Sequence, residues 1–112
     1  MTYGPHLELT VLVNDAAHFH HLPLYTEIVH RAHKRGLAGA SVFRGIEGFG
    51  HTHRIHEQRI FDFASHMPMV VMIVDTEARI RAFLPEVHEI VGDVGVVTVH
   101  PVEMLAPAVG RN

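Results

Sequence analysis

The 112-residue sequence predicts an α+β domain, in which two strand–helix–strand units form a four-stranded antiparallel sheet with both helices on one face. Two observations predict this fold. A segment with the apolar pattern of a strand is followed by one with apolar residues at helical spacing, and this order occurs twice along the chain. In addition, 47% of the residues are hydrophobic and 19% are charged, which is too apolar for a disordered tail. We therefore expect residues 1–112 to form one domain with its core in residues 6–105.

The first unit covers roughly the first forty residues. Apolar and polar residues alternate over 7–13, which predicts a strand with one buried face, and the histidine-rich segment 14–21 is expected to be a loop. Apolar residues then recur at helical spacing from Pro23, which suits a first helical turn, to Gly36, which is a typical helix stop. The segment 40–46 is the second predicted strand.

The second unit begins with the continuous apolar run 69–74, which is typical of a central strand covered on both faces. Asp75-Thr76 supplies capping residues for a helix that is expected to end at Gly92-Asp93. Pro85 lies inside this helix and should kink it or leave one carbonyl bonded to water. The last predicted strand is 94–102.

With right-handed crossovers, this order gives a ferredoxin-like βαββαβ sandwich with a long insertion, residues 47–66, between strands two and three. A structureless insertion of this length is uncommon in a small domain and is usually functional. Because strand residues alternate between faces, the apolar strand residues cannot all point at the helices, and we expect the uncovered face to pack in a homo-oligomer. The residues considered are Leu12, Val42, Val71, Ile73, Val97 and Val99.

Composition excludes several classes of protein. The absence of cysteine excludes a disulfide scaffold, a cysteine-ligated zinc module and a thiol nucleophile. A net charge of −3 gives no general attraction to nucleic acid or to an anionic membrane. The longest apolar run, 67–74, is too short to span a bilayer, and the first residues lack the pattern of a signal peptide. We expect a cytoplasmic protein without a nucleic-acid partner.

Glycines and arginines after the second strand suggest an anion site. Gly45, Gly48 and Gly50 would allow backbone amides to approach a ligand, and Arg44 and Arg54 would add charge-assisted donors. Residues 92–95 could form a second cradle between helix and strand. The alternative is that these glycines serve only a turn and a bulge.

The chain has 12 histidines, and two groups of them have spacings that could bring imidazoles together. His51, His53 and His56 form one group, and His18, His20 and His21 the other. Imidazole-only ligation would suit zinc, nickel or copper. The alternative is a solvated loop, because neither group has a carboxylate or cysteine at fixed spacing.

Five motifs together resemble the uncharacterised-domain family 190, a PII-like group within the nitrogen regulatory PII superfamily. They are Pro23-Leu-Tyr-Thr-Glu-Ile-Val29, Gly36-Leu-Ala-Gly-Ala40, Arg44-Gly-Ile-Glu-Gly-Phe-Gly50, Arg54-Ile-His56 and Ala82-Phe-Leu-Pro85. The segments 39–57 and 97–103 also resemble the second strand with the start of the T-loop, and the last strand, of PII signalling proteins.

The resemblance implies a homotrimer that binds adenine nucleotides in the clefts between subunits and is not an enzyme. The T-loop, here 47–66, would then signal to a protein partner such as a membrane transporter or an enzyme. The ligand-binding residues implied by motifs and glycines together are Arg44, Gly45, Gly48, Phe49, Gly50, Arg54, His56, Gly92, Asp93 and Gly95.

The sequence departs from the PII pattern at two phosphate-binding positions. Val96 stands where PII proteins have a lysine, and His51-Thr52 replaces Arg-Gln. We therefore expect AMP or ADP as the effector rather than ATP. The long insertion also lacks a tyrosine that could be uridylylated. Two alternatives remain: a histidine-rich metal-binding or metal-tolerance trimer that holds a divalent metal at His51, His53 and His56, and a small enzyme acting at the subunit cleft.

Overall fold

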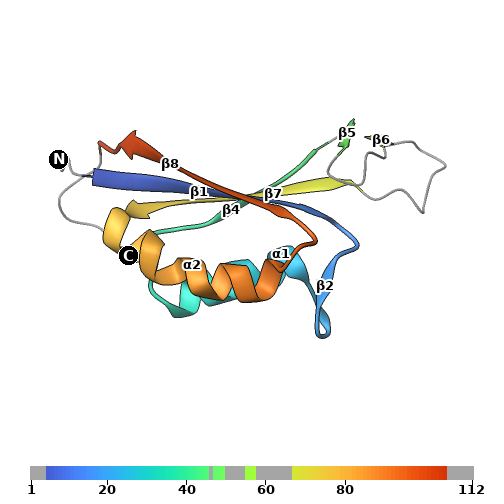
Figure 1. Ribbon diagram of the computed structural model, residues 1–112, viewed down its shortest axis with the longest axis horizontal. Helices are drawn as coiled ribbons and strands as arrows, with labels where there is room; N and C mark the ends of the chain where they lie inside the picture. The colour runs from blue at the N-terminus through green and yellow to red at the C-terminus, as the bar shows by residue number, and fades with distance from the viewer. Residues whose placement is uncertain (1–4, 46, 50–54, 58–66, 106–112) are drawn as a thin grey trace.

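The computed structural model describes residues 5–45, 47–49, 55–57 and 67–105, which form a sheet and a layer of two helices (Figure 1). The main sheet has the strand order β4-β7-β1-β8, and all its neighbouring strands are antiparallel. The predicted α+β fold with a four-stranded antiparallel sheet is confirmed. The strands are β1 (Pro5–Asn14), β4 (Ser41–Arg44), β7 (Pro68–Thr76) and β8 (Val96–Glu103).

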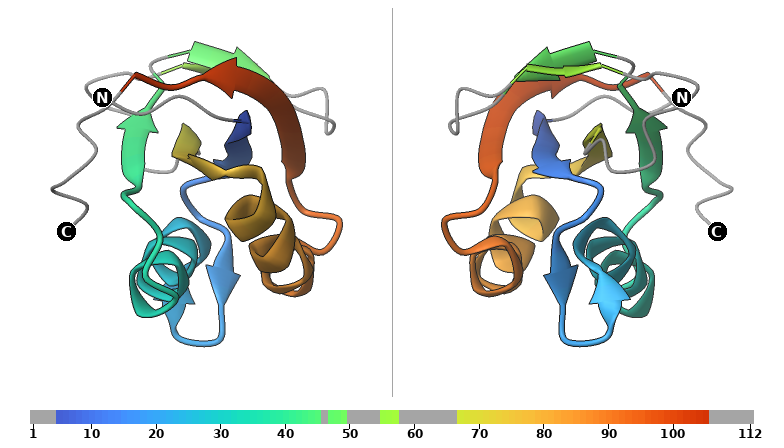
Figure 2. Two further views of the ribbon diagram at one scale, coloured as in Figure 1. Left: turned by 90° about the vertical axis from the view of Figure 1, so that its left-hand side faces the viewer. Right: turned by 90° about the vertical axis from the view of Figure 1, so that its right-hand side faces the viewer.

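Both helices, α1 (Leu24–Lys34) and α2 (Glu77–Val91), cover the same face of the sheet (Figure 2). Helix α1 ends as predicted: Gly36 has φ +73°, and its N–H donates to the carbonyl of His33 at 3.0 Å. Pro23 is the N-cap rather than a residue of the first turn. Helix α2 runs through the exposed Pro85, and because proline has no N–H, the carbonyl four residues earlier is left for water.

The core lies between the helices and the inward face of the two central strands. Register places Leu9 between Ile73 and Val99, and Val11 between Val71 and Val97, so these side chains share the helix-covered face. Burial of this face accounts for the alternation along β1 from Leu7 onward and along β7, so the prediction that β7 is covered on both faces is wrong. The innermost apolar residues, with 0–1% exposure, are Leu9, Val11, Leu24, Ile28, Val71, Ile73, Ile80, Phe83 and Val87.

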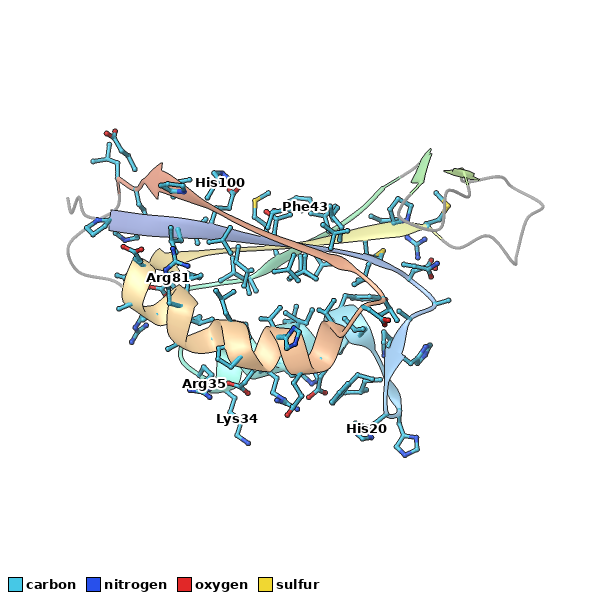
Figure 3. All side chains as sticks on the ribbon, viewed as in Figure 1. His20, Lys34, Arg35, Phe43, Arg81 and His100 are labelled. Atoms are coloured by element: carbon cyan, nitrogen blue, oxygen red, sulfur yellow. The ribbon has the colours of Figure 1, made fainter. Side chains whose placement is uncertain are left out.

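The opposite face of the sheet is uncovered in the single chain, and Phe43 and His100 project from it (Figure 3). The prediction that the apolar strand residues cannot all point at the helices is confirmed by Leu12. Of that set only Leu12 points away from the helices, because Val42, Val97 and Val99 pair with inward-facing residues. The apolar residues on the uncovered face are Leu12, Phe43, Val70, Met72, Val74, Val96 and Val102, which we call the open face.

Two short hairpins interrupt segments that were expected to be loops. Strands β2 (His18–Phe19) and β3 (Leu22–Pro23) form one hairpin, and β5 (Glu47–Phe49) and β6 (Ile55–Glu57) form the other. The second hairpin means that residues 47–66 are not an entirely irregular insertion. Neither helix in the described part of the chain is long and apolar enough to cross a membrane.

Candidate functional site

The candidate site lies at the end of the sheet where β1 ends and β7 begins. Asn14 pairs with Pro68 there, and Asp15 follows immediately. The Asp15 N–H donates to the Met67 carbonyl at 2.9 Å, and the Met67 N–H donates back to Asp15 Oδ1 at 3.2 Å. Asp15 is thereby held to the residue that precedes β7 by two hydrogen bonds.

Arg44, the last residue of β4, joins this cluster through its side chain. Its Nη1 donates to Asp15 Oδ2 at 3.0 Å, while the Arg44 side chain is 47% exposed and that of Asp15 only 18%. A guanidinium has five N–H donors, so a contact through one nitrogen leaves others available to an anion. Of the two arginines predicted to bind the ligand, Arg44 lies in the part of the chain that the structure describes.

Gly45 connects this arginine to the neighbouring strand. Its N–H donates to the Pro68 carbonyl at 2.7 Å, and a Cβ at this position would lie 2.6 Å from Pro68 Cγ. The close approach of the two strands therefore requires glycine here. This packing role is present whether or not the Gly45 amide faces a ligand.

The second predicted cradle, residues 92–95, connects α2 to β8. Gly92 has φ +56° and its N–H donates to the His88 carbonyl at 2.9 Å, which closes the helix. At Gly95 a Cβ would lie 2.7 Å from the Leu12 carbonyl oxygen and 2.6 Å from Val13 Cγ1. Both glycines thus have a conformational or packing reason to be glycine, while Asp93 between them is exposed.

The two predicted segments lie at the same end of the sheet but on opposite edges. Gly95 lies against Leu12 and Val13 near the end of β1, and Arg44 pairs with Met69 near the start of β7. Strands β7 and β1 separate the two edges, so β4 and β8 are three interstrand spacings, roughly 14 Å, apart. A compact anion cannot contact both segments of a single chain.

Three of the other predicted residues, Gly48, Phe49 and His56, belong to the β5–β6 hairpin. The backbones of Gly48 and His56 face each other in its ladder, and Phe49 pairs with Ile55. The predicted residues Gly50, His51, His53 and Arg54 lie outside the described residues.

The histidines do not form a metal site in the part of the chain that the structure describes, where no cluster of three or more potential ligands occurs. This includes His18, His20 and His21, which the sequence suggested as a group. His18 Nδ1 lies 2.6 Å from the Ala16 carbonyl oxygen, and the His20 ring packs edge-on against Phe19 at 4.4 Å between centroids.

An ion cluster on the helix layer was not predicted. Arg31 donates to Glu27 at 2.7 Å and to Glu86 at 3.0 Å, and Glu86 also contacts Arg35. Burial by itself would raise the pKa of Glu86, but the hydrogen bonds from Arg31 and Arg35 outweigh it and hold that pKa below its ordinary value. Hydrogen bonds to Glu86 and Glu27 in turn raise the pKa of Arg31. The Glu27–Arg31 spacing was a visible signal, but the pairing across helices was not.

Asp15 was also missed by the sequence interpretation. It lies in the segment 14–21, which was noted only for its polar and histidine-rich character. Its partners, Met67 and Arg44, are distant in sequence, and no motif of fixed spacing joins either of them to Asp15. Only the strand order brings the three residues together.

Comparison with known proteins gives the following matches. The model of the family DUF190, described as "Uncharacterized ACR", matches residues 6–104. A UPF0166 protein of Aquifex aeolicus is 36% identical over 100 residues, covering 87% of this chain and 90% of that protein. A UPF0166 protein of Methanocaldococcus jannaschii is 26% identical and covers 81% of this chain and 83% of that protein.

Among solved structures, CPII, a nitrogen regulatory PII-like protein from Thiomonas intermedia K12 bound to ADP, AMP and bicarbonate, has a TM-score of 0.66. It is 18% identical and covers 92% of this chain and 91% of its own. CutA1 from Oryza sativa has a TM-score of 0.61 at 14% identity, covering 91% of this chain and 84% of its own. At these identities the likeness concerns the fold.

Proposed function

Because the chain belongs to the DUF190 family, as its sequence motifs indicated, we propose that it is a PII-like regulatory protein rather than an enzyme. In this proposal it binds a small anionic effector, an adenine nucleotide with AMP or ADP preferred over ATP, and signals through the segment 47–66 to a membrane transporter or an enzyme. The PII-like protein CPII, which shares this fold, was crystallised with ADP and AMP.

The observation that carries this proposal is the half-exposed guanidinium of Arg44 at the base of the β5–β6 hairpin. Its remaining N–H donors suit a phosphate or carboxylate oxygen. An anion bound there would contact the strand that leads directly into the segment proposed to signal. Ligand recognition and signalling would then share one end of the sheet.

We further propose that the effector lies between copies of the chain in a homotrimer. Within one chain the segment after β4 and the segment before β8 are on opposite edges of the sheet. Association of copies would bring the β4 edge of one chain beside the β8 edge of the next. The apolar open face supports association, because it includes Phe43 at 52% and Val96 at 42% exposure.

Sedimentation tests the assembly. The substitution Phe43→Asp places a charge on the open face and should convert a trimer into monomers at micromolar concentration. Leu22→Asp is the matched control, because Leu22 is also exposed at 37% but lies on the β2–β3 hairpin. A wild-type chain that sediments as a monomer would contradict the proposed trimer.

Calorimetric titration with AMP, ADP and ATP, and in parallel with zinc, nickel and copper salts, tests the effector. We expect saturable binding of AMP and ADP, and weaker binding after Arg44→Gln. Metal binding that requires His51, His53 and His56, without nucleotide binding, would instead favour the histidine-rich metal-binding protein.

A further inference from the structure

A carboxylate contacts the arginine that we propose as an anion ligand. Asp15 Oδ2 accepts a hydrogen bond from Arg44 Nη1 at 3.0 Å, and Asp15 is not among the residues expected to bind the effector. We infer that Asp15 sets the charge selectivity of this site by disfavouring ligands with additional phosphate groups. This inference rests on the proposed function, because it takes Arg44 as an anion ligand.

Asp15 is fixed in place and cannot simply swing away from an incoming anion. Its Oδ1 accepts the Met67 N–H, and its own N–H donates to the Met67 carbonyl. The turn that follows is fixed as well, since Asn14 Oδ1 accepts the Ala16 N–H at 2.7 Å. The carboxylate is therefore a stationary negative charge beside the guanidinium.

The charges of the described residues balance in a way that favours ligands of low charge. Asp15 neutralises Arg44, so the pair offers hydrogen-bond donors without a net positive charge. Asp93, exposed on the other predicted segment, adds a second negative charge if neighbouring chains complete the site. A first phosphate gains the hydrogen bonds, whereas each further phosphate charge gains little, because repulsion by Asp15 offsets its attraction to Arg44.

The test measures affinity against ligand charge in the full chain. Magnesium-free titrations at low salt would use AMP, ADP and ATP, together with inorganic phosphate, pyrophosphate and tripolyphosphate. For Asp15→Asn we expect affinity to rise about threefold for each added ligand charge at a separation of roughly 7 Å in a water-like medium. The ratio of ATP to AMP affinity should therefore rise about tenfold.

Two control variants separate charge from structure. Asp15→Glu keeps the charge while disturbing the geometry, and it should leave the affinity ratio near that of the wild type. Glu77→Gln removes one carboxylate that pairs with an arginine, Arg81 at 3.3 Å. Glu77 begins α2 after the end of β7, whereas Asp15 is bonded to Met67 before the start of β7. Glu77→Gln changes the net charge as Asp15→Asn does and should not alter the ratio.

The outcomes distinguish this inference from the proposed function. If Asp15→Asn changes affinity for all nucleotides by the same factor, the inference is overturned while nucleotide binding stands. If nucleotides do not bind but the inorganic anions show the Asp15-dependent ranking, the inference stands and the nucleotide assignment fails. If none of these anions binds, Arg44 is not an anion ligand and the inference is overturned.

Discussion

An aspartate pairs with an arginine at each end of the sheet, and the two pairs differ in what surrounds them. Asp75, at the end of β7, is fully buried; its Oδ1 accepts the Thr76 N–H at 2.7 Å and its Oδ2 the Ala38 N–H at 2.9 Å. Arg79 lies 3.5 Å from this carboxylate and also donates to the Gly36 carbonyl at 2.8 Å.

At the other end, Asp15 is partly exposed and its partner Arg44 makes a single hydrogen bond to it. The residue types are the same, but the two aspartates differ in burial and in their hydrogen-bond partners, so the two pairs have different roles. The two arginines are almost equally exposed, Arg79 at 48% and Arg44 at 47%, so the difference lies in the aspartates. The buried Asp75 holds the loop after α1 against the start of α2, so removing it should cost stability. Asp15 makes fewer backbone contacts and is partly exposed, so altering the Asp15–Arg44 pair should change binding more than stability.

The largest loss of stability is expected from replacing the buried Asp75. Asp75→Ala leaves the part-buried N–H groups of Ala38 and Thr76 without this acceptor and should lower the free energy of unfolding by about 2–4 kcal/mol. Asp15→Ala should lower it by only about 1 kcal/mol, because Asp15 is closer to solvent. Urea unfolding of both variants at one protein concentration provides the measurement. Equal losses would remove the distinction between the two ends.

A substitution at Gly95 tests whether this glycine, at the same end of the sheet as Asp15, is required for packing. In Gly95→Ala the new methyl meets the Leu12 carbonyl oxygen at 2.7 Å, so we expect a loss of about 2 kcal/mol from overpacking. Gly39→Ala is the control, because no atom lies within 4 Å of a Cβ there. A Gly95→Ala variant of unchanged stability but reduced nucleotide affinity would favour a ligand cradle over the packing role.

The sequence predicted the main elements because each has a strong local signal. Alternation in β1 and helical spacing with Gly36 as the stop agree with burial in the folded chain. The apolar run 69–74 forms the central strand β7 as predicted, but the helices cover only one of its two faces. The two hairpins were missed because their strands have two or three residues each. The turn of the first hairpin has His20 at φ +58°, where a glycine or asparagine would have been recognisable.

The candidate site was less predictable because it depends on contacts between distant segments. The sequence indicated Arg44 and Gly45 through local motifs, but the Asp15–Arg44 pair follows only from strand order and register. Likewise, the assignment of Leu12 and Val42 to opposite faces requires knowing which residues pair across the sheet. A shift of one residue in register reverses such assignments.

Arg44→Gln should change ligand binding without a large change in stability. It removes the charged donor while leaving the backbone bond of Gly45 to Pro68, so nucleotide affinity should fall by about 1–3 kcal/mol. Stability should change by less than about 1 kcal/mol, as for other exposed ion pairs. Arg79→Gln, the equivalent change in the arginine that pairs with Asp75, should leave nucleotide affinity unaltered. Calorimetry and urea unfolding of both variants compare the two arginines directly.

The smallest effect is expected at Glu86, whose ion cluster lies on the helix layer between the two ends. The hydrogen bonds from Arg31 and Arg35 hold the pKa of Glu86 below its ordinary value despite burial, so this carboxylate stabilises the fold above the pH at which a free glutamate ionises. That stabilisation is lost as the pH falls through the lowered pKa. Glu86→Gln should therefore cost about 0.5–1 kcal/mol at pH 7 and less at pH 3, because lowering the pH toward the lowered pKa begins to protonate the wild-type carboxylate and makes it neutral like the glutamine. A double-mutant cycle with Arg35→Gln, measured by urea unfolding at both pH values, isolates this coupling from other acid effects. A coupling of equal size at both pH values would show that packing, and not ionisation, joins the two helices here.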